Sequence, residues 1–259
     1  MTPSNNDEDT RPLAAPCQSL HWTAPLHWLR LGWRDLRQAR AISLSYGLIM
    51  VIFSYAISAA AWYLGNLGLY LGLISGFVFL GPLLALTLYS VSARRETGNP
   101  LTLGATARDA WNALSDAMVF AVAVLIIFLI WARAATLIHV FFPVEADTSI
   151  QDWLLFLGIG SAVGAIFCAI IFMTSAFSLP MILDRDADTI TAIISSVNAT
   201  LRNKAAMLVW SLCIGVCVLA GFLTAYLGFA VLLPLIGHAT WHGYRETLDT
   251  TDWSRKTFQ

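Results

Sequence analysis

Charge is scarce in this sequence. Charged residues make up 12% of the 259 residues, whereas hydrophobic residues make up 58%. A soluble domain usually carries about 25% charged residues, so the composition excludes an ordinary soluble protein and predicts an all-α, polytopic membrane protein. Residues 1–40 also lack the short apolar stretch and the small-residue cleavage site of a secretory signal peptide. We therefore expect the first hydrophobic segment to be an uncleaved anchor.

Catalytic motifs are also missing from the sequence. It contains no GxSxG stretch, no HExxH and no phosphate-cradling glycine loop. The segment LDRDADT (183–189) has alternating aspartates but lacks the glycine and distal glutamate of a calcium loop, which favours a helix cap at Asp188 or Thr189. Cys213 and Cys217 lie four apart without a nearby His or carboxylate, so we interpret them as packing residues. We expect no enzyme activity, no cofactor, no metal and no nucleic-acid partner.

Long apolar runs are what the sequence has in abundance. Runs of about 20 residues predict six transmembrane helices in three hairpins, at about 42–64, 67–92, 117–142, 153–183, 205–226 and 227–244. Residues 29–246 would form the transmembrane domain. A flexible cytoplasmic N-terminal tail (1–28) would precede it, and a cytoplasmic C-terminal tail (247–259) would follow it.

The basic residues predict one orientation for these six helices. Of the 15 Lys and Arg residues, all except Arg133 fall before the first helix, after the last one, or in the connections on that same side. The opposite side has two tight turns and an acidic loop at 143–153. The positive-inside rule therefore predicts a multi-pass protein of the bacterial inner membrane with both termini cytoplasmic.

Each predicted hairpin follows a basic amphipathic stretch. The three stretches are HWLRLGWRDLRQAR (27–40), LGATARDAWNALSDA (103–117) and DTITAIISSVNATLRNK (188–204). Apolar residues at helical spacing within them predict short helices at the cytoplasmic membrane surface. The chain therefore reads as three diverged units, each an interfacial helix followed by a transmembrane hairpin.

Several segments resemble a family of bacterial predicted integral membrane proteins that is catalogued as a domain of unknown function. They are GWRDL (32–36), SLSYGL (43–48), FLGPLLALTLY (79–89), SAFSLPMILDRD (175–186) and LPLIGHATWHGYR (233–245). The resemblance spans nearly all of the chain after residue 28. It implies a six-helix inner-membrane protein and no particular activity. Some family members carry a cytochrome c oxidase label, but a catalytic subunit of that kind needs more intramembrane histidines than this chain, with five in all, can provide.

Arg133 is the first candidate functional residue, because it lies near the middle of the apolar run LIIFLIWARAATLIHVFF (125–142). A mid-membrane arginine is costly and normally faces the interior of the helix bundle, where it pairs with another group. The six predicted spans contain no Asp or Glu. The expected partners are therefore helix carbonyls, hydroxyls of Tyr55, Tyr63, Tyr70 or Thr224, the loop residues Glu145 or Asp147, or a ligand, lipid or partner protein.

His238 and His242 are a second, weaker candidate, for a metal or haem. Their spacing of four places them on one helix face. A metal site normally needs a third ligand and a carboxylate that supports the ligands, and Glu246 alone is well placed for that role. The alternative is an anchoring role at the headgroup level, as for the neighbouring Trp241 and Tyr244.

Two hypotheses about function follow. The first is a non-catalytic accessory, assembly or lipid- or partner-binding protein of a larger membrane complex, such as a respiratory one. It would contact the lipid bilayer and other inner-membrane subunits. The second is a small transporter or channel that uses Arg133 for an anionic solute. The sequence does not specify the oligomeric state.

Overall fold

The fold is built from helices of two lengths. The computed structural model describes residues 12–64, 73, 81, 83–142 and 149–257. Within these ranges every regular element is a helix, and β-type pairing is limited to two isolated bridges, Cys17 with Leu248 and Arg185 with Arg255. The predicted all-α class is therefore confirmed for the described part of the chain.

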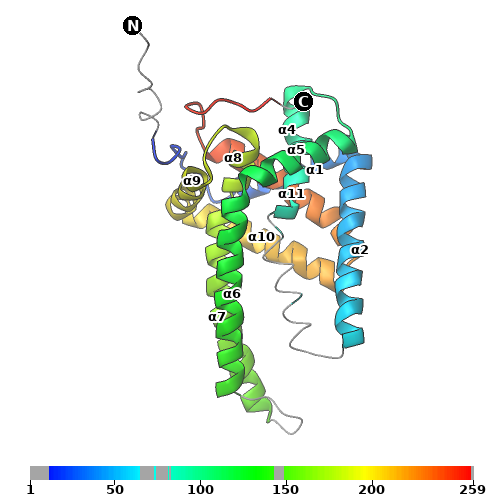
Figure 1. Cartoon of the computed structure of the whole chain (residues 1–259), viewed down its shortest axis with the longest axis vertical. Helices are drawn as coiled ribbons and strands as arrows, with labels where there is room; N and C mark the ends of the chain where they lie inside the picture. The colour runs from blue at the N-terminus through cyan, green and yellow to red at the C-terminus, as the bar shows by residue number, and fades with distance from the viewer. Residues whose placement is uncertain (1–11, 65–72, 74–80, 82, 143–148, 258–259) are drawn as a thin grey trace.

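Four of the helical segments are long and apolar enough to cross a membrane. They lie in α2 (Arg40–Leu64), α6 (Met118–Phe141), α7 (Ile150–Ser175) with its continuation α8 (Ser178–Asp184), and α10 (Lys204–Leu223). A helix of 24 residues, such as α6, is about 36 Å long, which exceeds the hydrocarbon thickness of a bilayer. Figure 1 shows α6 and α7 as one long hairpin, with α2 standing apart from it and α10 inclined between them.

The described helices do not confirm the predicted number of six spans. Most of the second predicted helix (67–92) lies outside the described residues, and its described end continues as α4 (Leu86–Thr97). The sixth corresponds to α11 (Phe229–Thr247), which is a helix but is not among the four candidate spans. Pro234 and a run of buried polar residues lower its apolar character.

A layer of shorter helices covers one end of the molecule, here named the polar end. It consists of α1 (Ala24–Gln38), α5 (Leu103–Asp116), α8, α9 (Thr189–Arg202) and the segment 248–257. The three predicted amphipathic helices are therefore present as α1, α5 and α9. Side-chain caps begin two of them: Thr102 accepts a hydrogen bond from the Ala105 amide (3.1 Å), and Asp188 accepts one from the Thr191 amide (2.9 Å).

The described segments 12–23 and 248–257 pack onto the polar end. The amide of Gln18 donates to the carbonyl of Thr247 (2.8 Å), and the amide of Leu20 donates to Oδ1 of Asn203 (2.7 Å). At the other terminus Trp253 is buried. The division of the chain at residue 28 stays a prediction, although residues 12–23 already pack against α9 and α11 and α1 begins at Ala24. Hydrogen bonds to buried backbone and side-chain groups hold this segment in place.

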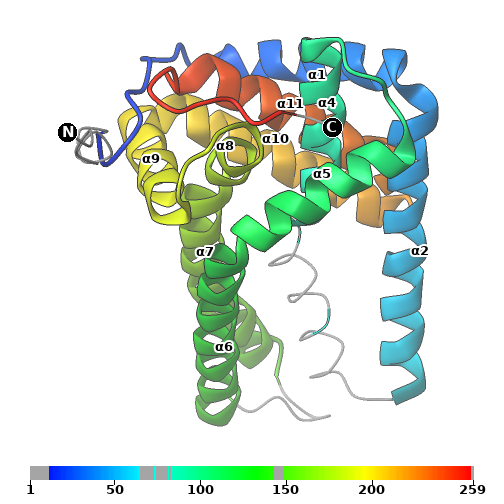
Figure 2. The same cartoon turned by 45° about the horizontal axis from the view of Figure 1, so that its top comes forward.

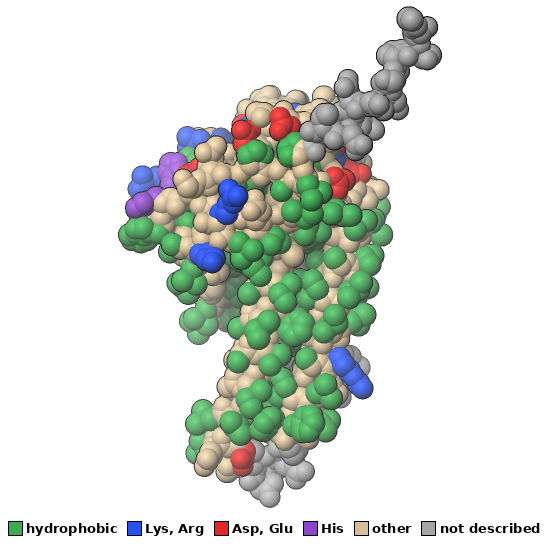
Figure 3. All heavy atoms as spheres, turned by 90° about the vertical axis from the view of Figure 1, so that its left-hand side faces the viewer, with side chains coloured by type: hydrophobic (Ala, Val, Ile, Leu, Met, Phe, Trp, Pro, Cys, Tyr) green, Lys and Arg blue, Asp and Glu red, His purple; other side chains and the backbone are tan. Residues whose placement is uncertain are grey.

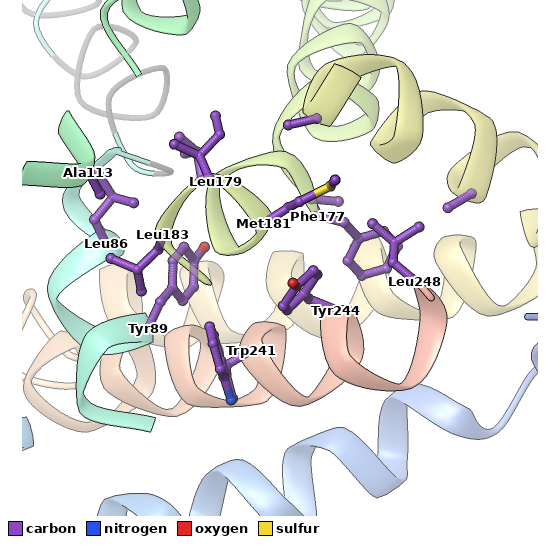
Figure 4. Packing of buried hydrophobic residues seen from close by; sticks show 14 of the residues in the cluster. Leu86, Tyr89, Ala113, Phe177, Leu179, Met181, Leu183, Trp241, Tyr244 and Leu248 are labelled. Atoms are coloured by element: carbon purple, nitrogen blue, oxygen red, sulfur yellow. The ribbon is translucent and has the colours of Figure 1, made fainter. Parts of the chain in front are cut away.

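The main hydrophobic core lies directly beneath the polar layer. Figure 4 shows Leu86 and Tyr89 of α4 beside Leu183 of α8, and the same cluster includes Leu179 of α8 and Trp241 of α11. In contrast, the α6–α7 hairpin exposes apolar side chains along most of its length, and charged side chains gather mainly at the polar end (Figure 3). This division is the one expected of a membrane domain whose apolar outer surface contacts lipid.

Helices α1 and α11 pack side by side at unusually short range (Figure 2). A Cβ atom added to Gly32 would lie 2.7 Å from the backbone nitrogen of Ala239, and one added to Gly243 would lie 2.9 Å from the Trp28 ring. The ring of Trp28 in turn meets Trp210 of α10 edge-on, with ring centroids 5.6 Å apart. Small residues thus let the first and last helices approach closely, as is common in membrane helix packing.

Candidate functional site

Arg133 lies on the outer face of α6. The inner face of this helix is filled by Phe120 and Val124, which are buried, and by Trp131, which packs against the core. Arg133 is exposed and follows the helical repeat of Ile126, Ile130 and Leu137, each about half exposed. The charge therefore lies within an outward-facing apolar stripe. We name this surface the α6 stripe and define it as Ile126, Ile130, Arg133, Leu137 and Val140.

The expectation that Arg133 faces the bundle interior is wrong for the single chain. The large aromatic side chains of α6 occupy the face that meets α7 and the core, which leaves Arg133 on the opposite side. No hydrogen bond or ion pair joins Arg133 to any residue that the structure describes. Two expected partners are engaged elsewhere: the Tyr55 hydroxyl donates to the carbonyl of Ala225 (2.6 Å), and that of Thr224 to the carbonyl of Ala220 (2.8 Å).

Three other expected partners, Tyr70, Glu145 and Asp147, lie outside the described residues. Arg133 is the sixteenth of the 24 residues of α6. Its α-carbon is therefore about 12 Å from one end of the helix and about 23 Å from the other. The Arg133 guanidinium therefore lies within the apolar length of α6 and faces the surroundings of the α6–α7 hairpin rather than another described residue.

The second candidate pair, His238 and His242, belongs to a buried polar network at the polar end. His238 is fully buried, with its Nε2 2.9 Å from the Ser43 hydroxyl and its Nδ1 2.8 Å from the Ser92 hydroxyl. His242 Nε2 lies 2.9 Å from a carboxylate oxygen of Asp35. The Ser92 hydroxyl also donates to that carboxylate (2.8 Å). One continuous set of hydrogen bonds therefore connects α1, α2, α4 and α11.

Asp35 is the centre of this network. It is buried and also forms an ion pair with Arg95 of α4. Burial alone would raise the pKa of the Asp35 carboxyl group, but the hydrogen bond and charge of His242, the hydrogen bond from Ser92 and the charge of Arg95 together lower it. The carboxylate is thus held ionised, and it compensates the positive charge of Arg95 inside the packed layer.

This arrangement engages both ring nitrogens of His238 with hydroxyl groups. Within the described ranges no group of three His, Cys, Asp or Glu side chains is arranged to hold a metal ion. The side chain expected to support the histidines, Glu246, instead accepts a hydrogen bond from the Trp28 indole (2.8 Å). The metal or haem site at His238 and His242 stays a prediction, and the contacts present are those of a structural network.

No motif in the sequence marks Asp35 as a functional residue. The burial of Asp35 could nevertheless be predicted from the helical repeat of α1. The residues on the buried face of this helix include Trp28, Gly32, Asp35 and Leu36. An aspartate on the apolar face of a basic helix requires a buried cationic partner. The identity of that partner could not be read from α1 alone.

A second polar cluster lies at the polar end and is centred on Asp184, which is fully buried. Its carboxylate accepts hydrogen bonds from the Tyr244 hydroxyl (2.9 Å) and from Nε of Arg255 (2.8 Å). Arg255 and Arg245 also pair with Glu96. Asp184 of the LDRDADT segment therefore acts in ion pairs, and Asp188 caps α9 as predicted.

Comparison with known protein families gives one match, and the matched segment contains Arg133. Residues 69–184 match the family described as predicted integral membrane protein (DUF2189). This chain is an integral membrane protein. The family resemblance is confirmed over the matched segment, which includes α6 and α7. The segments GWRDL, SLSYGL and LPLIGHATWHGYR lie outside the match, so the confirmed extent is narrower than the sequence analysis predicted. No curated protein and no solved structure matches the chain.

Proposed function

We propose that this protein is a non-catalytic accessory protein that associates with another membrane subunit through the α6 stripe. The observation that carries the proposal is the position of Arg133, which is exposed at membrane depth and has no partner among the described residues. Leaving an arginine toward lipid costs about 2.5 to 3.5 kcal/mol on insertion scales. A carboxylate on a neighbouring transmembrane segment would offset that cost and fix the register of the two helices.

The chemistry of the stripe favours a different protein over a second copy of this chain. A two-fold pairing of α6 stripes would bring two Arg133 side chains together, and like charges at close range repel. The predicted spans of this chain contain no Asp or Glu with which a second copy could compensate them. The partner is therefore expected to carry an acidic residue within its own transmembrane segment.

The proposed setting is the bacterial inner membrane, with the polar end in the cytoplasm. The positive-inside pattern of the sequence supports this orientation. The alternative function, transport of an anionic solute, would need a pathway formed between chains, because Arg133 faces outward in the single chain.

The test is site-specific photo-crosslinking in native membranes. The crosslinking residue is placed at Leu137 on the α6 stripe and, as a matched control, at Val216, which is exposed on α10 (48% and 66% exposed). We expect Leu137 to yield one discrete product with another membrane protein and Val216 to yield lipid adducts. Arg133→Leu should lower the yield from Leu137 roughly thirtyfold or more, the effect of losing one member of a buried charge pair.

Folding is controlled in the same experiment. Arg133→Leu should leave the melting temperature of the purified chain unchanged, because no described residue contacts the guanidinium through a hydrogen bond or ion pair. A protein product that Arg133→Leu leaves undiminished would contradict the proposal, as would lipid adducts alone at Leu137. Loss of anionic solute uptake without loss of crosslinking would favour the transport alternative.

A further inference from the structure

Helix α1 has two faces of opposite character. The buried face carries Trp28, Gly32 and Leu36 and packs against α11. On the other side Arg30, Arg34 and Arg37 are exposed. Their spacing of four and three residues places the three guanidinium groups along one line of the helix surface. We name this line the α1 arginine face.

The positive charge of the α1 arginine face is not compensated. No ion pair joins Arg30, Arg34 or Arg37 to a carboxylate in the described part of the chain. The one acidic residue of α1, Asp35, is turned to the opposite side, where it pairs with Arg95 and His242. Elsewhere at the polar end, basic side chains such as that of Arg255 lie in ion pairs with buried acids. What distinguishes the α1 arginine face is that it gathers three exposed guanidinium groups without an ion pair on one line of a single helix.

Aromatic and apolar side chains accompany these arginines. Trp33 is 40% exposed, and the Arg37 guanidinium lies 5.4 Å from the centroid of its ring. Leu26, one turn before Arg30, is also exposed. Tryptophan beside basic residues is typical of the headgroup level of a membrane, where the ring is half in lipid and the charge is in water.

The position of α1 in the fold places it at that level. Helix α2 begins two residues after α1 ends, and it exposes Leu48, Ile49 and Ile52 in its third and fourth turns. Helix α2 is one of the four candidate spans, so this apolar surface contacts lipid tails. The α1 arginine face therefore lies beside the point at which a lipid-facing surface starts, within reach of lipid headgroups.

We infer that the α1 arginine face binds the headgroups of anionic phospholipids. Guanidinium groups form short, charge-assisted hydrogen bonds with phosphate oxygens, often two at a time. A zwitterionic headgroup offers the same phosphate but cancels its charge, so the three arginines select lipids with net negative charge. The continuity with α2 and the presence of Trp33 favour a lipid over an acidic protein. This inference does not depend on the α6 stripe or on its partner.

The test uses the purified full-length chain and native mass spectrometry. The detergent-solubilised protein is mixed with phosphatidylglycerol and phosphatidylcholine of equal chain length, and the retained lipids are counted. We expect preferential retention of phosphatidylglycerol. Each arginine near an anionic surface contributes on the order of fivefold in affinity. The variant R30Q/R34Q/R37Q should therefore lose roughly a hundredfold and retain the two lipids equally.

The control variant removes the same charge from elsewhere on the polar end. Arg108, Arg202 and Lys204 are exposed, and no ion pair joins them to a described carboxylate, so R108Q/R202Q/K204Q removes the same three positive charges, two from arginine and one from lysine. It should retain phosphatidylglycerol as the wild type does. Thermal unfolding of all three proteins checks that the fold is kept, and glutamine preserves helix propensity at the exposed sites.

Four outcomes would overturn the inference. The first is equal retention of both lipids by the wild type. The second is unchanged retention of phosphatidylglycerol by R30Q/R34Q/R37Q. The third is an equal loss in the control variant, which would show that total charge rather than the α1 arginine face governs binding. Binding of an acidic protein in place of lipid would also count against it.

Discussion

Replacing Gly47 with alanine should separate α2 from α11. Gly47 is buried where the two helices cross, and a Cβ atom added there would lie 2.0 Å from the carbonyl oxygen of Ala230. Ordinary van der Waals contact begins at 3.4 Å, so the backbones must move apart by about 1.4 Å, the difference between the two distances. The obstacle is backbone, which cannot rotate away as the end of a flexible side chain can.

The magnitude of this effect combines three contributions. Overpacking of this kind costs about 1 to 3 kcal/mol. The displacement of α11 also weakens the 2.9 Å hydrogen bond between Ser43 and His238, one turn from Gly47, at about 1 kcal/mol. The higher helix propensity of alanine stabilises the folded chain by about 0.5 to 1 kcal/mol and so offsets part of this cost. We expect a net destabilisation of about 1.5 to 3 kcal/mol, or a fall of roughly 5–10 °C in melting temperature.

The assay is thermal unfolding of the purified chain in detergent, with Gly158→Ala as the matched control. Gly158 is an exposed glycine within the transmembrane helix α7, and a Cβ atom added there meets nothing within 4 Å. This control should melt at the wild-type temperature or slightly above it. If Gly47→Ala and Gly158→Ala behaved alike, α2 and α11 could not cross at Gly47, and the packing of α11 described above would be refuted.

Other predictions concern the polar end and use the same unfolding assay. Asp35→Asn should destabilise the chain by about 2 kcal/mol, because the partly buried Arg95 and His242 would lose their hydrogen bonds to a charged carboxylate, whereas the exposed Asp249→Asn should have little effect. Because the folded pKa of Asp35 is lowered, its contribution is present above about pH 4, the unfolded value, and is lost as pH falls through the folded value. Wild type should therefore lose stability relative to Asp35→Asn in that acid range, and parallel pH profiles would contradict this. Asp188→Ala should cost about 1 kcal/mol through loss of the α9 cap, and Asp188→Asn, which keeps an acceptor, should restore most of it.

Helix positions could be predicted from the sequence because apolar runs and amphipathic repeats are local signals. The predicted spans at 42–64, 117–142 and 205–226 agree with α2, α6 and α10 to within three residues at each end. The direction of Arg133 could not be predicted in this way. Helix α6 is apolar on all sides, so its hydrophobic pattern does not distinguish the face toward α7 from the face toward lipid.

The polar network shows a second limit of sequence reasoning. The spacing of His238 and His242 correctly placed both on α11, but their partners come from three other helices. Asp35 and His242 are separated by 207 residues, and no local pattern connects them. Their pairing depends on the close approach of α1 and α11, which in turn depends on Gly32 and Gly243 at positions where helix propensity alone would favour another residue.

The pairing of α1 with α11 also has a consequence for biosynthesis. The chain is made from the N-terminus, so α1 emerges before α11 and its buried face stays uncovered until α11 has been made. During that interval Trp28 and the carboxylate of Asp35 have neither Gly243 nor His242 beside them. The polar end can therefore close only after α11 has been synthesised. In a truncated product that ends before α11 this surface would stay uncovered, and we expect chaperones and membrane proteases to recognise it.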